Sequence, residues 1–225
     1  MAIIEPTNKD VVHPEQIKQY SSSLRLWHWA NLIVISGSLL TVLLNSTLLK
    51  SWNVAPVIQS ELKNVGNQAT ADQAKSVAHA LSDKVWDIHV YFGYGLAALL
   101  LFRIILEFFQ LADQKFITKI KAAYHEFKHV KKQREAARHE LAVKLIYGAF
   151  YILLVIMVVT GLFLAFEDFF APYKAIRHSV KSVHGFCMYL VLAFIAVHVI
   201  GVFLAERKDG KGIVSDMING GGLDK

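Results

Sequence analysis

Four histidines lie within or at the edge of long apolar stretches in this chain of 225 residues. His28 stands between two tryptophans in the segment SLRLWHWAN, His89 begins a second apolar stretch, and a third contains both His184 and His198. These last two are 14 residues apart, which on a helix turns their side chains to within about 40° of one face and separates them by roughly 21 Å. Ionisable groups inside a bilayer are rare and usually functional, so these four residues are the candidates for chemistry.

The apolar stretches are long enough to cross a membrane. Three of them, of 24, 22 and 24 residues, carry no formal charge, and the fourth contains only Asp87, Arg103 and Glu107. About 20 helical residues cross a hydrocarbon layer of ~30 Å, and 54% of the chain is hydrophobic. The sequence therefore predicts an all-α integral membrane protein, a four-helix bundle forming a single domain over residues 1–225, with spans at about 26–49, 85–109, 144–166 and 182–205.

The distribution of basic residues predicts the orientation. Residues 110–140 carry eight Lys or Arg, against four in residues 50–84 and three in residues 167–181. Because cytoplasmic loops carry the excess of positive charge, we expect residues 110–140 and both termini in the cytoplasm and the other two loops outside. The net charge of +6 is then a sign of membrane topology and not of nucleic-acid binding.

Both long loops are expected to contain helix. In the outer loop, residues 50–84, the segment TADQAKSVAHALSDKVWDIH predicts a helix that is capped at Thr70 or Asp72 and runs into the second span. In the inner loop, residues 110–140, apolar side chains recur among lysines, which predicts a basic amphipathic helix on the inner leaflet: Phe116, Ile120, Tyr124 and Phe127. The polar opening MAIIEPTNKD lacks the basic region of a signal peptide, so we expect the first span to be retained.

Membrane depth sorts the histidines into two pairs. Since the first span runs outward and the fourth inward, His28 and His198 both fall near the cytoplasmic side. By the same reasoning, His89 and His184 fall near the outer side. Helix bundles hold cofactors between facing helices, and two axial imidazoles complete a six-coordinate b-type haem suited to electron transfer. The single cysteine, Cys187, excludes covalent haem attachment, so the sequence predicts two non-covalent, bis-histidine haems enclosed by the bundle.

Other residues near these depths are candidate supports. Arg25 and Arg103 both fall near the inner pair and are expected to neutralise haem propionates. Five glycines could let a flat macrocycle approach the backbone: Gly37, Gly93, Gly161, Gly185 and Gly201. Trp27 and Trp29 are interpreted as anchors at the membrane interface.

Simpler interpretations exist for single residues. A histidine at the end of a span, such as His28 or His89 alone, usually hydrogen-bonds lipid headgroups. His125 and His129 have the i, i+4 spacing of metal ligands but fit a solvated basic face, and Cys187 fits a packing role. A proton relay or transporter would need acidic partners in the spans, which contain almost none. The two pairs matched in depth favour haem ligation.

The same residues resemble a known family. The segments RLWHW and HGFCMYLVLAFIAVH, His89 followed by Arg103, and the tail LAERKDGKGIVSDMINGG are similar to the b-type cytochrome subunits of membrane-bound nickel–iron hydrogenases. Their superfamily includes the gamma subunit of formate dehydrogenase and the bacterial cytochrome b561 proteins. The resemblance covers about residues 20–222 and implies two haems, one ligated by His28 and His198 and the other by His89 and His184.

This resemblance implies a dihaem cytochrome of the bacterial cytoplasmic membrane. It would carry electrons between an external dehydrogenase, expected to be a hydrogenase, and the quinone pool. We expect the chain to be an electron-transfer subunit and not an independent enzyme. The expected partners are membrane lipid, quinone and a hydrogenase small subunit on the outer face, with no nucleic acid. By depth, Lys144, Tyr147 and His139 are candidates for contacting or protonating the quinone.

Two other functions stay open. A stand-alone cytochrome b561 would oxidise quinol and reduce a small acceptor such as superoxide, and it would need no catalytic partner. A haem-free proton channel or transporter would be colourless. The long outer loop and the unusually basic inner loop leave the identity of the docking partner open.

Overall fold

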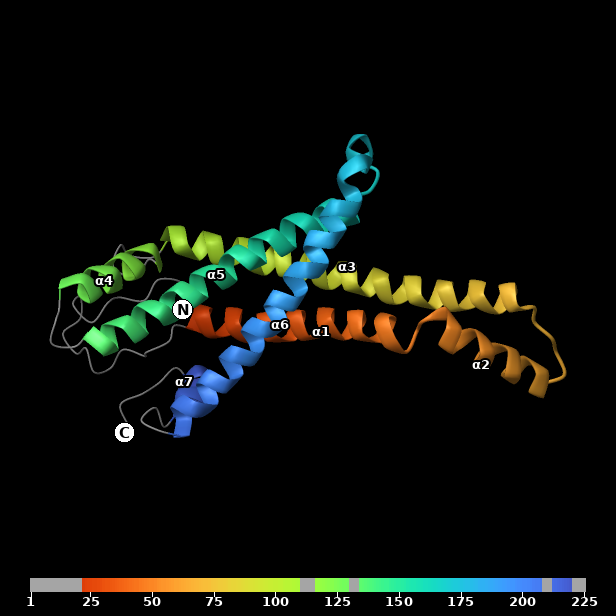
Figure 1. Cartoon of the computed structure of the whole chain (residues 1–225), viewed down its shortest axis with the longest axis horizontal. Coiled ribbons are helices and arrows are strands. Elements are labelled where there is room, and N and C mark those ends of the chain that lie inside the picture. The colour runs from red at the N-terminus through yellow and green to blue at the C-terminus, as the bar shows by residue number, and fades with distance from the viewer. Residues whose placement is uncertain (1–21, 110–115, 130–133, 208–211, 220–225) are drawn as a thin grey trace. The chain divides into compact units, whose positions relative to one another are not determined.

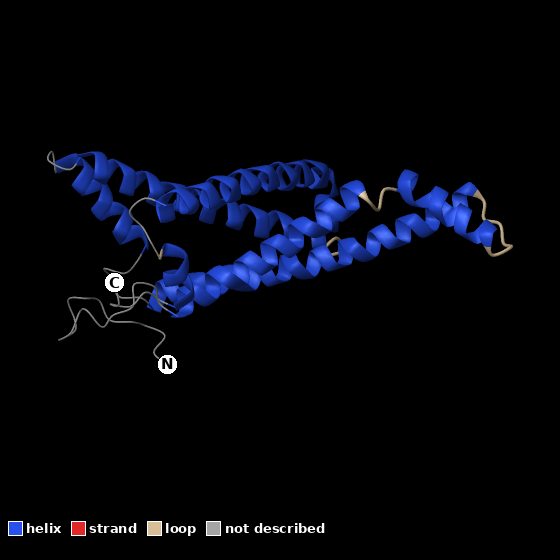
Figure 2. Ribbon diagram, turned by 90° about the horizontal axis from the view of Figure 1, so that it is seen from below, coloured by secondary structure: helices blue, strands red, loops and turns tan. Residues whose placement is uncertain are grey.

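A computed structural model describes residues 22–109, 116–129, 134–207 and 212–219 of the chain. Every regular element in these ranges is helical, and they contain no strand (Figure 2). The elements, labelled in Figure 1, are α1 (Ser22–Thr47), α2 (Ser51–Asn64), α3 (Ala71–Phe109), α4 (Phe116–His129), α5 (Arg134–Ala165), the 3₁₀ helix η3 (Ala171–Ile176), α6 (Arg177–Arg207) and α7 (Ile213–Asn219).

Four helical segments of the described chain are long and apolar enough to cross a membrane: Ser22–Thr47, Ala71–Phe109, Leu141–Ala165 and Ala171–Arg207. The prediction of an all-α protein with four membrane spans is therefore confirmed. The helix of the second span, α3, begins at Ala71, well before the start predicted for this span at residue 85. Its 39 residues measure about 58 Å, since each adds about 1.5 Å, which is nearly twice the ~30 Å of the hydrocarbon layer.

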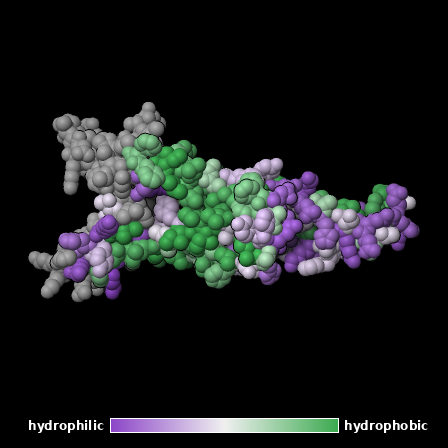
Figure 3. Space-filling view, turned by 90° about the horizontal axis from the view of Figure 1, so that it is seen from above, coloured by the Kyte–Doolittle hydropathy of each residue, from purple (hydrophilic) through white to green (hydrophobic). Residues whose placement is uncertain are grey.

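The chain divides into two compact units, residues 30–98 and residues 1–29 with 99–225. In the first unit, α1 and α3 pair through polar side chains placed within the apolar helices. Asn45 Nδ2 donates to the Ser82 carbonyl oxygen (3.3 Å), and the Ser82 hydroxyl donates to Asn45 Oδ1 (3.2 Å). In Figure 3, hydrophilic side chains gather over α2 and the first turns of α3, and hydrophobic side chains gather over the spans, where they contact lipid.

Gly37 has a packing role in this unit. A Cβ atom at this position would collide with the ring of Phe92 on α3, so the absence of a side chain lets that ring lie directly against the backbone of α1. The expectation that Gly37 makes room for a macrocycle is therefore wrong for this glycine. At Gly93 a Cβ would meet nothing within 4 Å, so the space there remains open.

The start of α3 confirms the predicted cap in the outer loop. The Gln73 backbone N–H donates to the Thr70 hydroxyl (3.2 Å), and the Thr70 backbone N–H donates to the Gln73 side-chain oxygen (2.9 Å). This reciprocal pair is a capping box, which satisfies two backbone donors at a helix start. The preceding helix α2, which contains Pro56, was not predicted.

The second unit contains the packed pairs α4–α5 and α5–α6, with η3 and α7 against α6. Leu154 of α5 is fully buried, and Cys187 and Val191 of α6 are buried, which agrees with a packing role for the cysteine. The rings of Phe150 and Phe194 stack between α5 and α6 at 4.1 Å. The predicted amphipathic helix of the inner loop is present as α4, whose residues Ile120 and Phe127 are partly buried while Tyr124 is exposed.

We predict that Thr70→Ala will fray the first turn of α3 without unfolding the protein. Losing a capping hydroxyl costs about 1 kcal/mol, and the effect should stay local because the turn lies beyond the membrane-spanning part. Amide hydrogen exchange near residues 71–74 should accelerate about fivefold. Asp72→Ala is the control, since the Asp72 carboxylate is almost fully exposed and lies 3.9 Å from Lys75. Equal acceleration in both variants would contradict the assigned cap.

Candidate functional site

The structure brings His28 of α1 and His198 of α6 together. Their ring centroids are 6.3 Å apart, with an angle of 56° between the ring planes. Two imidazoles bound on opposite sides of one metal atom, each at about 2 Å, place their centroids roughly 6 to 6.5 Å apart. The distance between the two rings therefore fits one iron atom with two axial histidines.

Aromatic side chains hold both rings in place. The Phe194 ring is nearly parallel to that of His198, at 5.9 Å and 7°, and Phe194 is itself stacked on Phe150. Trp29 meets His28 edge to face at 5.2 Å. Because the stack extends from α5 through Phe194 to His198, the ring of His198 has little freedom to turn.

Trp27 is not an interface anchor, contrary to the interpretation from sequence. Only 7% of its surface is exposed, its indole N–H donates to the Leu99 carbonyl oxygen on α3 (2.9 Å), and its ring lies 5.6 Å from that of Tyr151 on α5. A tryptophan at a span end can instead fill the space between helices when its N–H finds an internal acceptor. Trp27 thereby ties α1 to both α3 and α5 one residue before His28.

Arg103 lies in the same unit and is surrounded by polar partners inside an apolar helix. Its Nε donates to the Tyr151 hydroxyl (3.1 Å), and its Nη2 lies 3.2 Å from a carboxylate oxygen of Glu107, one turn further along α3. The remaining nitrogen, Nη1, is buried and makes no hydrogen bond. A buried, unsatisfied donor on a cation is costly, so Arg103 is suited to an anionic group such as a haem propionate.

Arg25 connects α1 to α7. Its Nη1 donates to the Ile218 carbonyl oxygen, and Trp29 Nε1 donates to the Met217 carbonyl oxygen (3.2 Å). The last carbonyls of a helix lack partners within the helix, and these two side chains supply them for α7. Arg25 Nε remains buried without a hydrogen bond, so this guanidinium has the same kind of unused donor as Arg103.

The start of α7 is also held by a side chain. The Glu206 carboxylate accepts from the Gly212 N–H (2.7 Å) and the Val214 N–H (3.3 Å), and Gly212 has a positive φ of 97°, which favours glycine. Both ends of this short helix are therefore fixed, on the side of the unit that contains His28.

His89 lies in the other unit, in a pocket of hydroxyl groups from α1. Its Nδ1 is 2.9 Å from the Thr41 hydroxyl, 3.3 Å from the Ser38 hydroxyl and 3.3 Å from the Ser38 carbonyl oxygen. Trp86 meets the ring edge to face at 5.4 Å. These three polar contacts are all made by Nδ1, the ring nitrogen on the side of α1.

His184 of α6 has a closely similar environment on α5. Its Nδ1 lies 2.8 Å from the Thr160 hydroxyl, and the next residue, Gly161, makes room for the ring, because a Cβ there would lie 3.2 Å from His184 Cε1. Beside it on α6, Gly185 faces open space. The pairing of His184 with His89 stays a prediction.

The three quinone candidates lie on α5. Lys144 is partly buried and Tyr147 is 39% exposed, whereas the His139 side chain lies outside the described residues. His125 of α4 is exposed, and in the described part of the chain no three His, Cys, Asp or Glu side chains could hold a metal ion.

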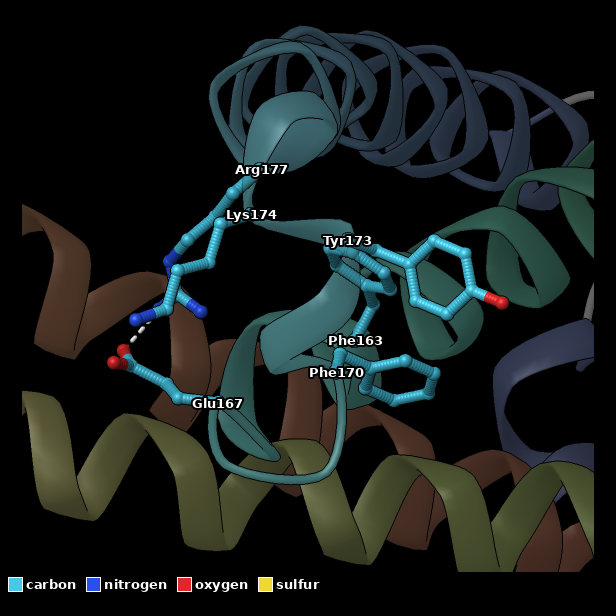
Figure 4. A pocket seen from close by; sticks show the side chains of 6 residues that line it. All are labelled: Phe163, Glu167, Phe170, Tyr173, Lys174 and Arg177. Atoms are coloured by element: carbon cyan, nitrogen blue, oxygen red, sulfur yellow. Dashed lines mark hydrogen bonds and ion pairs between the residues drawn. The ribbon is translucent and has the colours of Figure 1, made fainter.

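A pocket lies between α5, η3 and α6 (Figure 4). Arg177 forms an ion pair with Glu167 and donates to the Leu164 carbonyl oxygen (3.1 Å). In Figure 4, Arg177 and Lys174 reach toward Glu167. The pocket is lined by Phe163, Glu167, Phe170, Tyr173, Lys174 and Arg177. None of the predicted site residues lines it.

Sequence reasoning missed several side chains that contact the candidates, and four of the polar ones are Thr41, Thr160, Glu107 and Tyr151. A usable signal was present for two of them. Glu107 follows Arg103 by four residues, the spacing of an ion pair on a helix, and Thr160 is a polar residue within a run of 22 uncharged residues. The other two required knowledge of which helix faces which.

The comparisons with known proteins identify one family. A family model described as prokaryotic cytochrome b561 matches residues 19–220, which include all four histidines, Arg25 and Arg103. No curated protein and no solved structure matches the chain.

We predict that Arg103→Leu will weaken haem retention about tenfold or more, because a charge-assisted hydrogen bond contributes roughly 1.5–3 kcal/mol. Haem per polypeptide after competition with apomyoglobin would measure this. Arg103→Leu could also act by leaving the Glu107 carboxylate without its ion pair, and the double variant Arg103→Leu with Glu107→Leu tests this. Haem loss that persists in the double variant shows that Arg103 holds the cofactor, whereas full recovery would mean that an unpaired Glu107 was responsible.

Proposed function

The chain belongs to the prokaryotic cytochrome b561 family, and from this premise we propose that it carries electrons across the bacterial cytoplasmic membrane between an outer dehydrogenase and the quinone pool. Family membership and the four apolar helices identify a multi-pass bacterial membrane protein that binds b-type haem and transfers electrons. The direction across the membrane, the number of haems and both partners belong to the proposal.

The observation that carries the proposal is the distance of 6.3 Å between the rings of His28 and His198. In the proposal these two residues would hold one haem on the cytoplasmic side. Arg103 and Arg25 each have an unsatisfied buried nitrogen in the same unit, as expected of residues that neutralise propionates. Phe194 and Trp29 fix the planes of the two rings.

For the second haem we propose His89 and His184 as ligands. The support is their common depth near the outer side, predicted from the sequence, and the way each ring is held. In both, a threonine hydroxyl contacts Nδ1, and a hydrogen bond at the second ring nitrogen is usual for a metal-bound histidine. Gly161 allows the ring of His184 to approach α5.

When bound, such a haem supplies reversible one-electron transfer, and two protein ligands leave no coordination position for oxygen. The residues of the chain determine where this happens. In the proposal, residues of α1, α3 and α6 would hold the haems at two depths, and apolar side chains would exclude water between them. A quinone takes up two electrons and two protons to become a quinol, so the inner side also needs proton donors. Lys144 and Tyr147 of α5 are proposed for this contact.

The outer donor is proposed to be the small subunit of a nickel–iron hydrogenase, on the strength of the motifs RLWHW and HGFCMYLVLAFIAVH. On this proposal the chain is a subunit of an oxidoreductase complex. If the purified chain alone catalysed sustained quinol oxidation with superoxide, the stand-alone cytochrome would replace this assignment. A colourless purified protein would instead favour a proton channel or transporter.

The proposed function predicts electron transfer across a sealed bilayer. In proteoliposomes that contain trapped ferricyanide, dithionite added outside should bleach the trapped acceptor at a rate proportional to the amount of protein. His198→Ala should reduce this rate to that of protein-free vesicles, because the inner haem loses a ligand. His178→Ala is the matched control, an exposed histidine on the same helix, and should retain the full rate. Wild-type vesicles that bleach no faster than protein-free vesicles would contradict the proposal.

A further inference from the structure

The two predicted histidine pairs differ in the hydrogen bonds that their ring nitrogens make. At His89, one contact of Nδ1 is with the Ser38 carbonyl oxygen at 3.3 Å. A carbonyl oxygen accepts hydrogen bonds and cannot donate them, so Nδ1 must carry the proton. The nearer Thr41 hydroxyl, at 2.9 Å, is then the main acceptor of this N–H.

The Thr41 hydroxyl is prepared for that role. Its oxygen lies 2.6 Å from the Ser38 carbonyl oxygen of its own helix, so its single hydrogen is donated there. The lone pairs of the oxygen are left for the histidine N–H. The hydroxyl is buried along with the rest of Thr41, which keeps water from competing for the bond.

Thr160 repeats this arrangement at His184. Its hydroxyl oxygen lies 2.6 Å from the Ile156 carbonyl oxygen and 2.8 Å from His184 Nδ1. The hydroxyl again donates along its own helix and accepts from the ring. Two threonines on different helices, α1 and α5, thus make the same pair of bonds to the two outer histidines.

The inner histidines lack such a bond. His28 Nδ1 is buried without a hydrogen-bond partner, and His198 makes ring contacts with Phe194 and His28 but no hydrogen bond with the described residues.

The presence or absence of a hydrogen bond at Nδ1 changes the reduction potential of a bound iron. A hydrogen bond donated by Nδ1–H makes the opposite nitrogen a more basic ligand, which stabilises the oxidised iron and lowers its reduction potential. The outer site therefore has the features of a low potential, and the inner site those of a higher one.

We propose that Thr41 and Thr160 are positioning residues that set the outer haem to a lower midpoint potential than the inner haem. Electrons then move downhill from the outer face to the inner face, so the two hydroxyl groups determine the direction of flow. This inference rests on the proposed function, in which His89 and His184 share one haem and His28 and His198 the other.

The test is an equilibrium redox titration of the purified full-length chain, followed by its visible spectrum. His184→Ala first identifies the outer haem, whose midpoint should be the one that disappears and should be the lower of the two. Thr41→Val and Thr160→Val should each raise this lower midpoint, changing the ratio of reduced to oxidised outer haem about fivefold at a fixed ambient potential, as expected for one hydrogen bond. The higher midpoint should not move.

Two further variants separate the hydrogen bond from packing. Thr160→Ser keeps the hydroxyl and should restore the wild-type midpoint. Thr47→Val is the matched control, since the Thr47 hydroxyl donates to the Leu43 carbonyl oxygen (2.6 Å) in the same way but contacts no histidine, and it should change neither midpoint. If Thr160→Val retains no haem, Thr41→Val and Thr160→Ser decide the question.

Three results would overturn the inference: valine variants that leave the lower midpoint unchanged, a Thr160→Ser variant that shifts it as far as valine does, or disappearance of the higher midpoint in His184→Ala. Each of these leaves two haems in the wild-type chain and so leaves the proposed function intact. A wild-type chain without haem would remove the proposed function itself.

Discussion

The close approach of two imidazole rings, from His28 of α1 and His198 of α6, is the constraint on which the rest of this structure depends. The ring centroids are 6.3 Å apart. A shift of either ring by about 1 Å would exceed the tolerance of a metal site. Neighbouring side chains limit such shifts. Phe194 stacks on the ring of His198, Trp29 meets the ring of His28 edge to face, and the buried Trp27 fixes α1 to α3.

Several polar side chains within the apolar helices contact a histidine or join two helices. Asn45 and Ser82 join α1 to α3 by two hydrogen bonds, and Arg103 joins α3 to α5 through Tyr151. Thr41 and Thr160 each use one hydroxyl for two bonds. In a medium without water, an unmatched polar group is costly, so the few unmatched nitrogens, on Arg25, His28 and Arg103, are the positions where an additional group is expected.

Much of this could be predicted from the sequence, since the main signals are local. The length of the apolar stretches predicted four spans, and the spacing of 14 residues placed His184 and His198 on one helix face. The cap at Thr70 followed from residue types at the start of α3. The burial of Trp27 could not be predicted, because its indole N–H bonds to a carbonyl on another helix, Leu99. The contacts of Thr41 and Thr160 likewise depend on which helix faces which. The helix α2 was not predicted, and Pro56 lies inside it.

The central claim is that the four histidines act as two pairs, and counting haem per polypeptide in paired variants tests it most directly. Reduced-minus-oxidised spectra of detergent-purified protein should give two haems in the wild type and one in His28→Ala. Adding His198→Ala to His28→Ala should cost no further haem, since both residues serve the same iron, whereas adding His184→Ala should remove the remaining one. Complete loss of haem from the His28→Ala and His198→Ala double variant, with one haem retained when His28→Ala is combined with His184→Ala, would contradict the account.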